Sequence, residues 1–235
     1  MSSSINSVFY HSQLIRNKFR RFYDRHRLGF AIQPQKRNDL VRLGSDYGGW
    51  TIPSGLLHQS SVCYCVGAGE DISFDLSLIS SFGCDVYTFD PTPRSIAYVT
   101  GLSELDARLH FIPVGVWNQD AFIKFYAPQN PSHVSHSIVN LQQTSDYFDA
   151  KVKRLSTLMQ ELGHSRIDLL KIDIEGAEYD VLIDICKEGI DVRCICVEYD
   201  RPIAWVKARE AFAVLEASGY VPVHRFRTDV TYLRE

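Results

Sequence analysis

The sequence contains no run of roughly 20 apolar residues, so it predicts no membrane-spanning helix. Its first residues, MSSSINSVFYHSQ, lack the basic stretch followed by an apolar stretch that marks a secretory signal, and a cytoplasmic protein is the expectation. Charge of one sign is not in excess, because 25 Lys and Arg residues face 28 Asp and Glu residues. Glycine and proline are not enriched, at 14 and 9 of 235 residues, which excludes collagen-like and low-complexity chains.

The C-x-x-C spacing typical of zinc sites is also missing, although the chain has six cysteines. Cys63 and Cys65 form one C-x-C pair, and Cys194 and Cys196 form another, each within an apolar run typical of a strand. Side chains two positions apart on a strand point to the same face. We therefore expect reduced cysteines in the core rather than a metal site.

The chain is 45% hydrophobic, and its length fits one α/β domain preceded by a short segment. We expect a basic, helical N-terminal segment at 1–45, packed on a domain at 46–235. The basic residues fit a patch for an anionic substrate, a membrane surface or nucleic acid, or else a solvated helix face. We favour the solvated face, because the whole chain is slightly acidic and no motif for binding nucleic acid accompanies the patch. Apolar residues at roughly helical spacing predict an amphipathic helix there; they are Leu14, Ile15, Phe19, Phe22 and Tyr23.

Short apolar runs alternate with helix-length segments in the rest of the chain. Predicted strands are 62–66, 85–90, 109–117, 167–173 and 192–199, with a hairpin strand at 121–127 and two closing strands after residue 219. Because helices separate the first five, they predict a mainly parallel sheet, and the closing strands predict an antiparallel edge. Polar residues 128–150 predict a long loop, of a kind that often has a function.

Candidate site residues follow the first two strands. Gly67 and Gly69 allow a sharp turn and a close approach of the backbone to a ligand. Ile72 occupies the position of the third glycine in the nicotinamide fingerprint, which argues against a pyrophosphate ligand. Asp90 ends the second strand 21 positions after Gly69 and suits a ribose diol; it could instead cap the helix that follows.

The segment at 168–182, DLLKIDIEGAEYDVL, is the most specific motif. Asp173 closes a strand that is apolar along most of its length, and Glu175 follows just beyond it. Ligands bind at the carboxyl ends of the strands in open α/β sheets, so both carboxylates should lie beside the glycine turn. Glu175 and Glu178 could alternatively stabilise the dipole of the next helix.

The run LLKIDIEGAEYDVL, with VGAGEDISFD and TFDPTPRS upstream, resembles the FkbM family of S-adenosylmethionine-dependent methyltransferases over roughly residues 60–234. The resemblance implies the class I methyltransferase (Rossmann-like) fold, a seven-stranded, mainly parallel sheet with an antiparallel last strand and helices on both faces. It also implies methyl transfer to an oxygen of a small molecule or sugar. The cofactor-binding residues that it implies are Gly67, Ala68, Gly69, Asp90, Val116 and Asp173, with Trp117 near the adenine.

One departure from class I enzymes is Cys65, which stands where an acidic residue is common. The ammonium group of the cofactor must then be held by Asp173, Glu70 or backbone carbonyls.

A base or acceptor-orienting group is also needed for methyl transfer. Our candidates are Glu175 and Glu198, with His133 and His136 of the polar loop as competitors, and a divalent ion held by Asp173 and Glu175 is an alternative. Two other functions stay open: a nucleotide-binding oxidoreductase and a non-catalytic binding module on the same fold.

Overall fold

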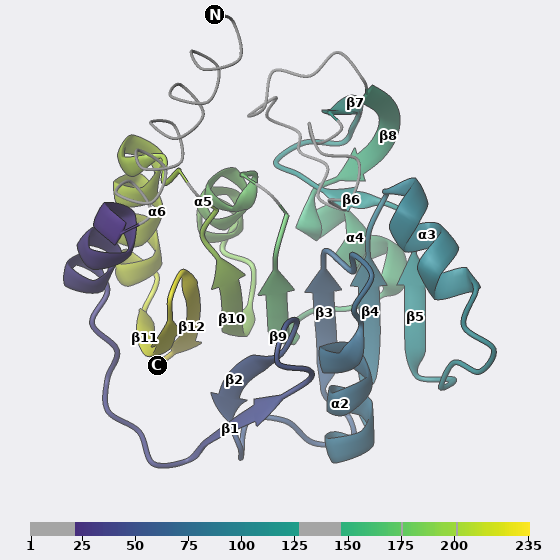
Figure 1. Cartoon of the computed structure of the whole chain (residues 1–235), viewed down its shortest axis with the longest axis horizontal. Coiled ribbons are helices and arrows are strands. Elements are labelled where there is room, and N and C mark those ends of the chain that lie inside the picture. The colour runs from purple at the N-terminus through teal and green to yellow at the C-terminus, as the bar shows by residue number, and fades with distance from the viewer. Residues whose placement is uncertain (1–21, 127–146, 175, 201) are drawn as a thin grey trace, which may run out of the picture.

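The computed structural model describes residues 22–126, 147–174, 176–200 and 202–235. Its centre is a sheet with helices on both faces (Figure 1). The strands of this sheet are β3 (Val62–Val66), β4 (Asp85–Phe89), β5 (Leu109–Ile112), β9 (Ile167–Ile172), β10 (Val192–Glu198), β11 (Tyr220–Phe226) and β12 (Asp229–Arg234). Their spatial order is β11-β12-β10-β9-β3-β4-β5.

The direction of the strands confirms the predicted fold class. Strands β5, β4, β3, β9 and β10 pair parallel to one another, and β12 pairs antiparallel to β10 and to β11. The last strand is thus the antiparallel one, and it lies between β10 and β11, so that β11 forms the edge. The carboxyl ends of the five parallel strands meet along one side of the sheet, as the strand–helix alternation predicts.

Alternation along the strands divides the core into two layers. In β3, Tyr64 and Val66 pack in one hydrophobic cluster, whereas Cys63 and Cys65 pack in the other, together with Cys194 and Cys196 of β10. All six cysteines are free thiols, and only Cys186 is not fully buried, so the predicted core role of the C-x-C pairs is confirmed. Reduced cysteines serve here as small apolar residues.

Different elements cover the two faces (Figure 1). One face carries α4 (Leu155–Leu162), α5 (Glu178–Glu188) and α6 (Trp205–Ala217). The other carries α2 (Ser73–Phe82), α3 (Pro93–Thr100) and the hairpin of β1 (Leu40–Leu43) and β2 (Trp50–Pro53). Helix α3 begins with Thr92 as the N-cap and Pro93 in the first turn.

The predicted strand at 109–117 is wrong, because the structure divides it between two sheets. Strand β5 ends at Ile112, and Gly115–Val116 forms β6 in a second sheet of order β6-β8-β7. Pro113 lies at the break, and a proline has no N–H to continue a ladder. In this second sheet β7 (Ala121–Tyr126) pairs with β8 (Tyr147–Lys153), so the expected hairpin of 121–127 with the preceding strand is also wrong.

The second sheet also shortens the predicted polar loop. Residues 147–150 belong to β8, although the sequence indicated a loop through residue 150. Most of the rest of that loop lies outside the described residues.

Residues 22–31 are helical and pack beside the start of α6. Asp24 accepts a hydrogen bond from Trp205 Nε1 at 3.0 Å, and the Arg27 guanidinium lies 4.2 Å from a Trp205 ring centroid. Phe22 and Tyr23, expected on the apolar face, are exposed, whereas Asp24 is buried. The prediction is wrong for these two aromatic residues, because Leu28 in the core and Asp24 bonded to Trp205 set the orientation of this helix. The other predicted members of the apolar face lie outside the described residues.

The boundary expected at residue 45 falls in the turn between β1 and β2, a hairpin that the sequence did not indicate. None of the helices in the described parts of the chain is both long and apolar enough to cross a bilayer. Within those same parts, His, Cys, Asp and Glu side chains form no group of three or more arranged to hold a metal ion.

Candidate functional site

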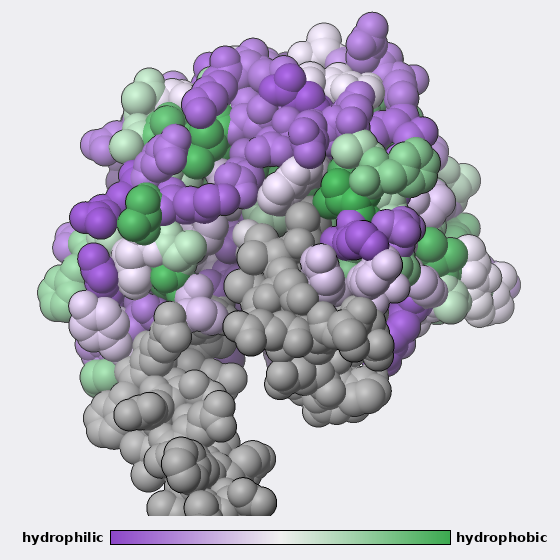
Figure 2. Space-filling model, turned by 90° about the horizontal axis from the view of Figure 1, so that it is seen from above, coloured by the Kyte–Doolittle hydropathy of each residue, from purple (hydrophilic) through white to green (hydrophobic). Residues whose placement is uncertain are grey.

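A cavity of about 400 Å³ lies at the carboxyl ends of β3, β4, β9 and β10. Its walls come from the turn after β3, the segment after β4, residues at the ends of β9 and β10, and two turns distant in sequence, 46–48 and 226–229. Seen from above these strand ends, the described surface is mostly hydrophilic (Figure 2). The cavity is where the topology of an open α/β sheet places a ligand, and its volume is within the range of small-molecule sites.

The turn after β3 depends on two glycines. Gly67 has a φ of +88°, and a Cβ atom there would lie 1.9 Å from the backbone oxygen of Asp173, so the end of β9 excludes any other residue. Gly69 has a φ of +55°, and a Cβ atom there would meet nothing within 4 Å. The first glycine lets two strand ends approach closely, and the second lies beside open space at the cavity.

Asp90, which follows β4, is 5% exposed and holds this turn in place. Its carboxylate accepts five hydrogen bonds: from Ala68 N (2.9 Å), Gly69 N (3.1 Å), Thr92 N (2.8 Å), Thr92 Oγ1 (2.7 Å) and Ser95 Oγ (2.8 Å). A carboxylate offers about four lone-pair directions, so protein donors already use its capacity. Asp90 thus joins the glycine turn to the start of α3, and its expected contact with a ribose stays a prediction.

Asp173 and Lys171 lie at the end of β9. Asp173 lines the cavity, and its Oδ2 atom lies 3.3 Å from the Nζ atom of Lys171. Lys171 also donates a hydrogen bond to the backbone carbonyl of Gly67. The sequence motif predicted the position of Asp173 correctly, and for Lys171 it suggested only a pairing with a carboxylate, which the structure confirms.

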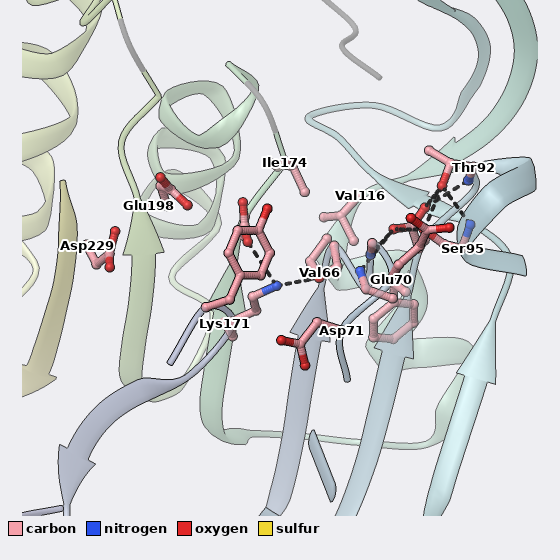
Figure 3. Close-up of a pocket in the computed structure, with 18 of the residues that line it drawn as sticks. Val66, Glu70, Asp71, Thr92, Ser95, Val116, Lys171, Ile174, Glu198 and Asp229 are labelled. Carbon is pink, nitrogen blue, oxygen red and sulfur yellow. Dashed lines mark hydrogen bonds and ion pairs between the residues drawn. The ribbon is translucent and has the colours of Figure 1, made fainter. Parts of the chain in front are cut away.

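Glu198 lines the opposite end of the cavity, at the end of β10. Its partner in the strand register is Asp229 of β12, which also lines the cavity (Figure 3). Two charged carboxylates directly opposite each other on paired strands repel, so this end of the cavity concentrates negative charge. The neighbouring turn contains Arg227, which has a φ of +56° although it is not glycine.

The hairpin turn between β1 and β2 forms the adjacent wall, and α2 holds it. Ser45 Oγ donates to Asp71 Oδ2 at 2.6 Å, and the Ser45 backbone N–H donates to Ser73 Oγ at 2.8 Å. Burial acts to raise the pKa of Asp71, but hydrogen bonds from Ser45, Ser73 and backbone N–H groups outweigh burial and lower it. This network presents Tyr47, which is 88% exposed, at the mouth of the cavity.

Carboxylates outnumber cations around the cavity. The lining includes three cationic residues, Arg42, Lys171 and Arg227, and seven acidic residues, Asp46, Glu70, Asp71, Asp90, Asp173, Glu198 and Asp229. Glu70 is paired with Arg94 at 2.7 Å. A cavity with this excess of negative charge favours cationic ligands and disfavours anionic ones.

A model of the methyltransferase FkbM domain matches residues 65–222. The chain belongs to the FkbM methyltransferase family. It is 30% identical over 141 residues to the rat (Rattus norvegicus) "Probable methyltransferase-like protein 24", covering 58% of this chain and 32% of that protein. It is 35% identical over 193 residues to "Methyltransferase 1" of Beauveria bassiana (strain ARSEF 2860), covering 65% of this chain and 77% of that protein. The chain spans about a third of the length of the rat protein.

Similar solved structures include a Methanococcus jannaschii fibrillarin pre-rRNA processing protein, with 13% identity, a TM-score of 0.44 and coverage of 76% of this chain and 68% of that chain. A second is human N-acetylserotonin methyltransferase in complex with SAM, with 11% identity, a TM-score of 0.37 and coverage of 75% and 48%.

In this FkbM family member, the structure gathers all six predicted cofactor-binding residues around one cavity. Of the predicted catalytic residues, Glu198 lines the cavity, whereas Glu175, His136 and the competitor His133 lie outside the described residues. Trp117 is absent from the described lining and packs in the small sheet instead.

Sequence reasoning missed several lining residues, namely Arg42, Asp46, Tyr47, Ser95, Phe125, Arg227 and Asp229. Asp46, Tyr47 and Arg227 lie in turns, where no periodic pattern shows which cavity a turn meets. The others lie on strands or a helix that the sequence did not connect with the cavity. Only Ser95 had a signal, because it follows the capping pair Thr92 and Pro93.

Proposed function

We propose that this chain uses S-adenosylmethionine to methylate a hydroxyl oxygen of a small-molecule or sugar acceptor. The observation that carries the proposal is the carboxylate-rich cavity over the Gly67–Gly69 turn in a chain of the FkbM family. Bound S-adenosylmethionine supplies a methyl group already activated on a sulfonium. The protein then has to bind the cofactor, orient the acceptor and receive its proton.

The charges of the cavity fit this cofactor and not a nicotinamide dinucleotide. A sulfonium and an ammonium suit the seven acidic lining residues, whereas a pyrophosphate would add negative charge. Ile72 is buried directly before α2, where the nicotinamide fingerprint has a glycine. Both observations favour the methyltransferase over the oxidoreductase.

Particular residues would hold each part of the cofactor. Gly67, Ala68 and Gly69 bring the backbone close to its amino-acid end, and Asp173 offers a carboxylate to the ammonium. Val116, buried at the opposite wall, offers an apolar surface to the adenine. Glu70 stands beside the turn and is the nearest alternative to Asp90 for the ribose hydroxyls, because its side chain is 42% exposed.

We propose Glu198 as the group that receives the acceptor proton. It lies beside Asp229 and close in the fold to the turns at 46–48 and 226–229, which would shape the acceptor pocket. The excess of carboxylates favours a neutral, hydroxylated acceptor over a phosphorylated one. Glu175 and His136 remain predicted alternatives for the same proton.

Binding experiments test the cofactor. Isothermal calorimetry should detect S-adenosylmethionine and S-adenosylhomocysteine but not NADH. Binding of NADH alone would overturn the proposal in favour of an oxidoreductase, and binding of none of these ligands would overturn it as well.

Methyl transfer to a panel of neutral sugars, alcohols and phosphorylated analogues tests the reaction. We expect Glu198→Gln to lower turnover roughly 100-fold and to leave the affinity for S-adenosylhomocysteine unchanged. Glu216→Gln, the same change at an exposed site on α6, is the matched control. Equal turnover in the two variants would remove Glu198 from the mechanism and leave Glu175→Gln and His136→Gln to be compared in the same assay. Binding without transfer to any acceptor would favour a non-catalytic module.

A further inference from the structure

A lysine lies inside the central part of the sheet, where a charged side chain is unusual. Lys171 is the fifth residue of β9, a strand that β3 and β10 flank and that is buried along its whole length. The residue is 6% exposed. An ammonium removed from water costs several kcal/mol unless opposite charge and hydrogen bonds offset the loss. The groups around Lys171 therefore identify what it does.

The direct partners of Lys171 are two groups that line the cavity (Figure 3). Its Nζ atom donates to the backbone carbonyl of Gly67 and lies 3.3 Å from Asp173 Oδ2. Gly67 follows β3 and Asp173 follows β9, so a single ammonium joins the ends of two neighbouring strands. Both of these oxygen acceptors keep lone pairs beyond the one that Lys171 uses.

A second carboxylate keeps this lysine charged. The register partner of Lys171 on β3 is Cys65, which has no charge to offer. The second negative charge comes from Asp75 of α2, which is 3% exposed and packs on the same side of the sheet as Lys171. Asp75 also accepts a hydrogen bond from Thr88 Oγ1 at 2.5 Å. Burial acts to lower the pKa of Lys171, but Asp173 and Asp75 outweigh burial and raise it.

We propose that Lys171 is a positioning residue for the amino-acid end of the cofactor. It holds the Gly67 carbonyl and the Asp173 carboxylate side by side, so that both can accept hydrogen bonds from the α-ammonium group of the cofactor. Asp75 balances the buried charge of Lys171. This inference rests on the proposed function. An α-ammonium group has three N–H donors, and a carbonyl next to a carboxylate suits two of them. Without Lys171, these acceptors would repel each other and lose their common geometry.

Two related ligands separate this role from general support of the fold. S-adenosylhomocysteine carries the amino-acid end, and 5′-methylthioadenosine has the same nucleoside and thioether without it. Loss of Lys171 should weaken the first ligand about tenfold, the scale of one or two charged hydrogen bonds. It should change the affinity for the second by less than about twofold. A residue that merely supports the fold would weaken both alike.

The experiment measures the dissociation constants of both ligands by calorimetry for the wild-type protein, three variants and a control variant. The variants are Lys171→Met, Lys171→Gln and the double variant Lys171→Met/Asp75→Asn. The double variant removes both buried charges, because Lys171→Met alone leaves the Asp75 carboxylate buried without its cation and can fail to fold. Lys187→Met, at an exposed lysine on α5, is the matched control.

Each outcome decides the proposal. A selective loss of S-adenosylhomocysteine binding supports it. Parallel weakening of both ligands, or unchanged binding of both, overturns it. Failure of the double variant to fold also counts against it, because Lys171 would then serve folding itself. If the wild-type protein binds no S-adenosylhomocysteine, the proposed function fails instead, before any variant is compared.

Discussion

Asp90 determines the shape of the turn after β3 through hydrogen bonds within the protein. Its five hydrogen bonds come from backbone and hydroxyl groups of the glycine turn and of the start of α3. The sequence placed this carboxylate at the end of a strand but left its role open between ribose binding and capping. Spacing alone does not reveal how many donors converge on a side chain, and only the fold brings Ala68 and Ser95 to the same oxygen atom.

We expect Asp90→Asn to lower the free energy of unfolding by about 3 kcal/mol in the absence of any ligand. The amide offers one acceptor oxygen where the carboxylate has two, so buried donors lose their charged partner. Urea unfolding followed by circular dichroism measures the change. Asp106→Asn, at an exposed carboxylate, is the matched control and should unfold at the wild-type urea concentration. A stable Asp90→Asn protein that has lost affinity for the cofactor would instead assign Asp90 to ribose binding.

At the scale of elements, strands and helices with a regular apolar pattern were predicted well, and irregular connections were not. Strand β9 was predicted because most of its residues are apolar, and the structure buries all of them. The β1–β2 hairpin was missed because its strands have only four residues each, too few for a periodic signal, although Trp50 and Ile52 pack in the same core cluster as α2. The same reason explains why Asp46 and Tyr47 were absent from the candidate site.

The hairpin turn gives a prediction at this scale. Ser45 Oγ donates to Asp71 and accepts from the backbone N–H groups of Tyr47 (3.1 Å) and Gly48 (2.8 Å). Ser45→Ala removes all three bonds, so the amides of Tyr47 and Gly48 should exchange with solvent about tenfold faster. Hydrogen exchange followed by mass spectrometry measures this change over residues 44–49.

Ser80→Ala is the control for the hairpin prediction, because Ser80 is exposed on α2 and its hydroxyl donates to the Ser77 carbonyl of the same helix. It should leave exchange over residues 44–49 unchanged. If Ser45→Ala leaves that exchange unchanged as well, then packing of the turn rather than its hydroxyl network holds this wall of the cavity.

At the scale of the whole molecule, strand–helix alternation and the closing strand pair predicted a mainly parallel sheet with an antiparallel edge, and the resemblance to the FkbM family implied its seven strands. They did not predict the second sheet, β6-β8-β7, because it pairs segments separated by the polar loop. Its Phe125 nevertheless reaches the cavity wall. Long-range pairing of short strands has no local signal, so the site is complete only in the folded chain.

The sheet end remote from the cavity carries a histidine that should make stability depend on pH. His164 Nδ1 lies 2.7 Å from Tyr64 Oη, and its ring packs edge-on against Tyr87 with 4.7 Å between centroids. Burial lowers the pKa of His164, with Asp85 opposing the shift and His110 adding to it. As pH falls below about 6.5, the unfolded chain binds a proton at this position before the folded chain does. The contribution of His164 to the free energy of unfolding should therefore decrease as pH falls below about 6.5 and should be constant at higher pH.

Urea unfolding at pH 7.5, 6.5 and 5.5 tests the sign and the assignment together. Wild-type protein should lose stability between pH 6.5 and 5.5, and His164→Gln should lose less over the same interval because residue 164 no longer titrates. Part of the dependence should remain in this variant, since burial and Arg42 also lower the pKa of His224. His58→Gln, at an exposed position, should follow the wild-type curve. Identical slopes for His164→Gln and wild type would show that the Tyr64 contact tolerates the charged imidazole, and the pH dependence would then belong to other groups.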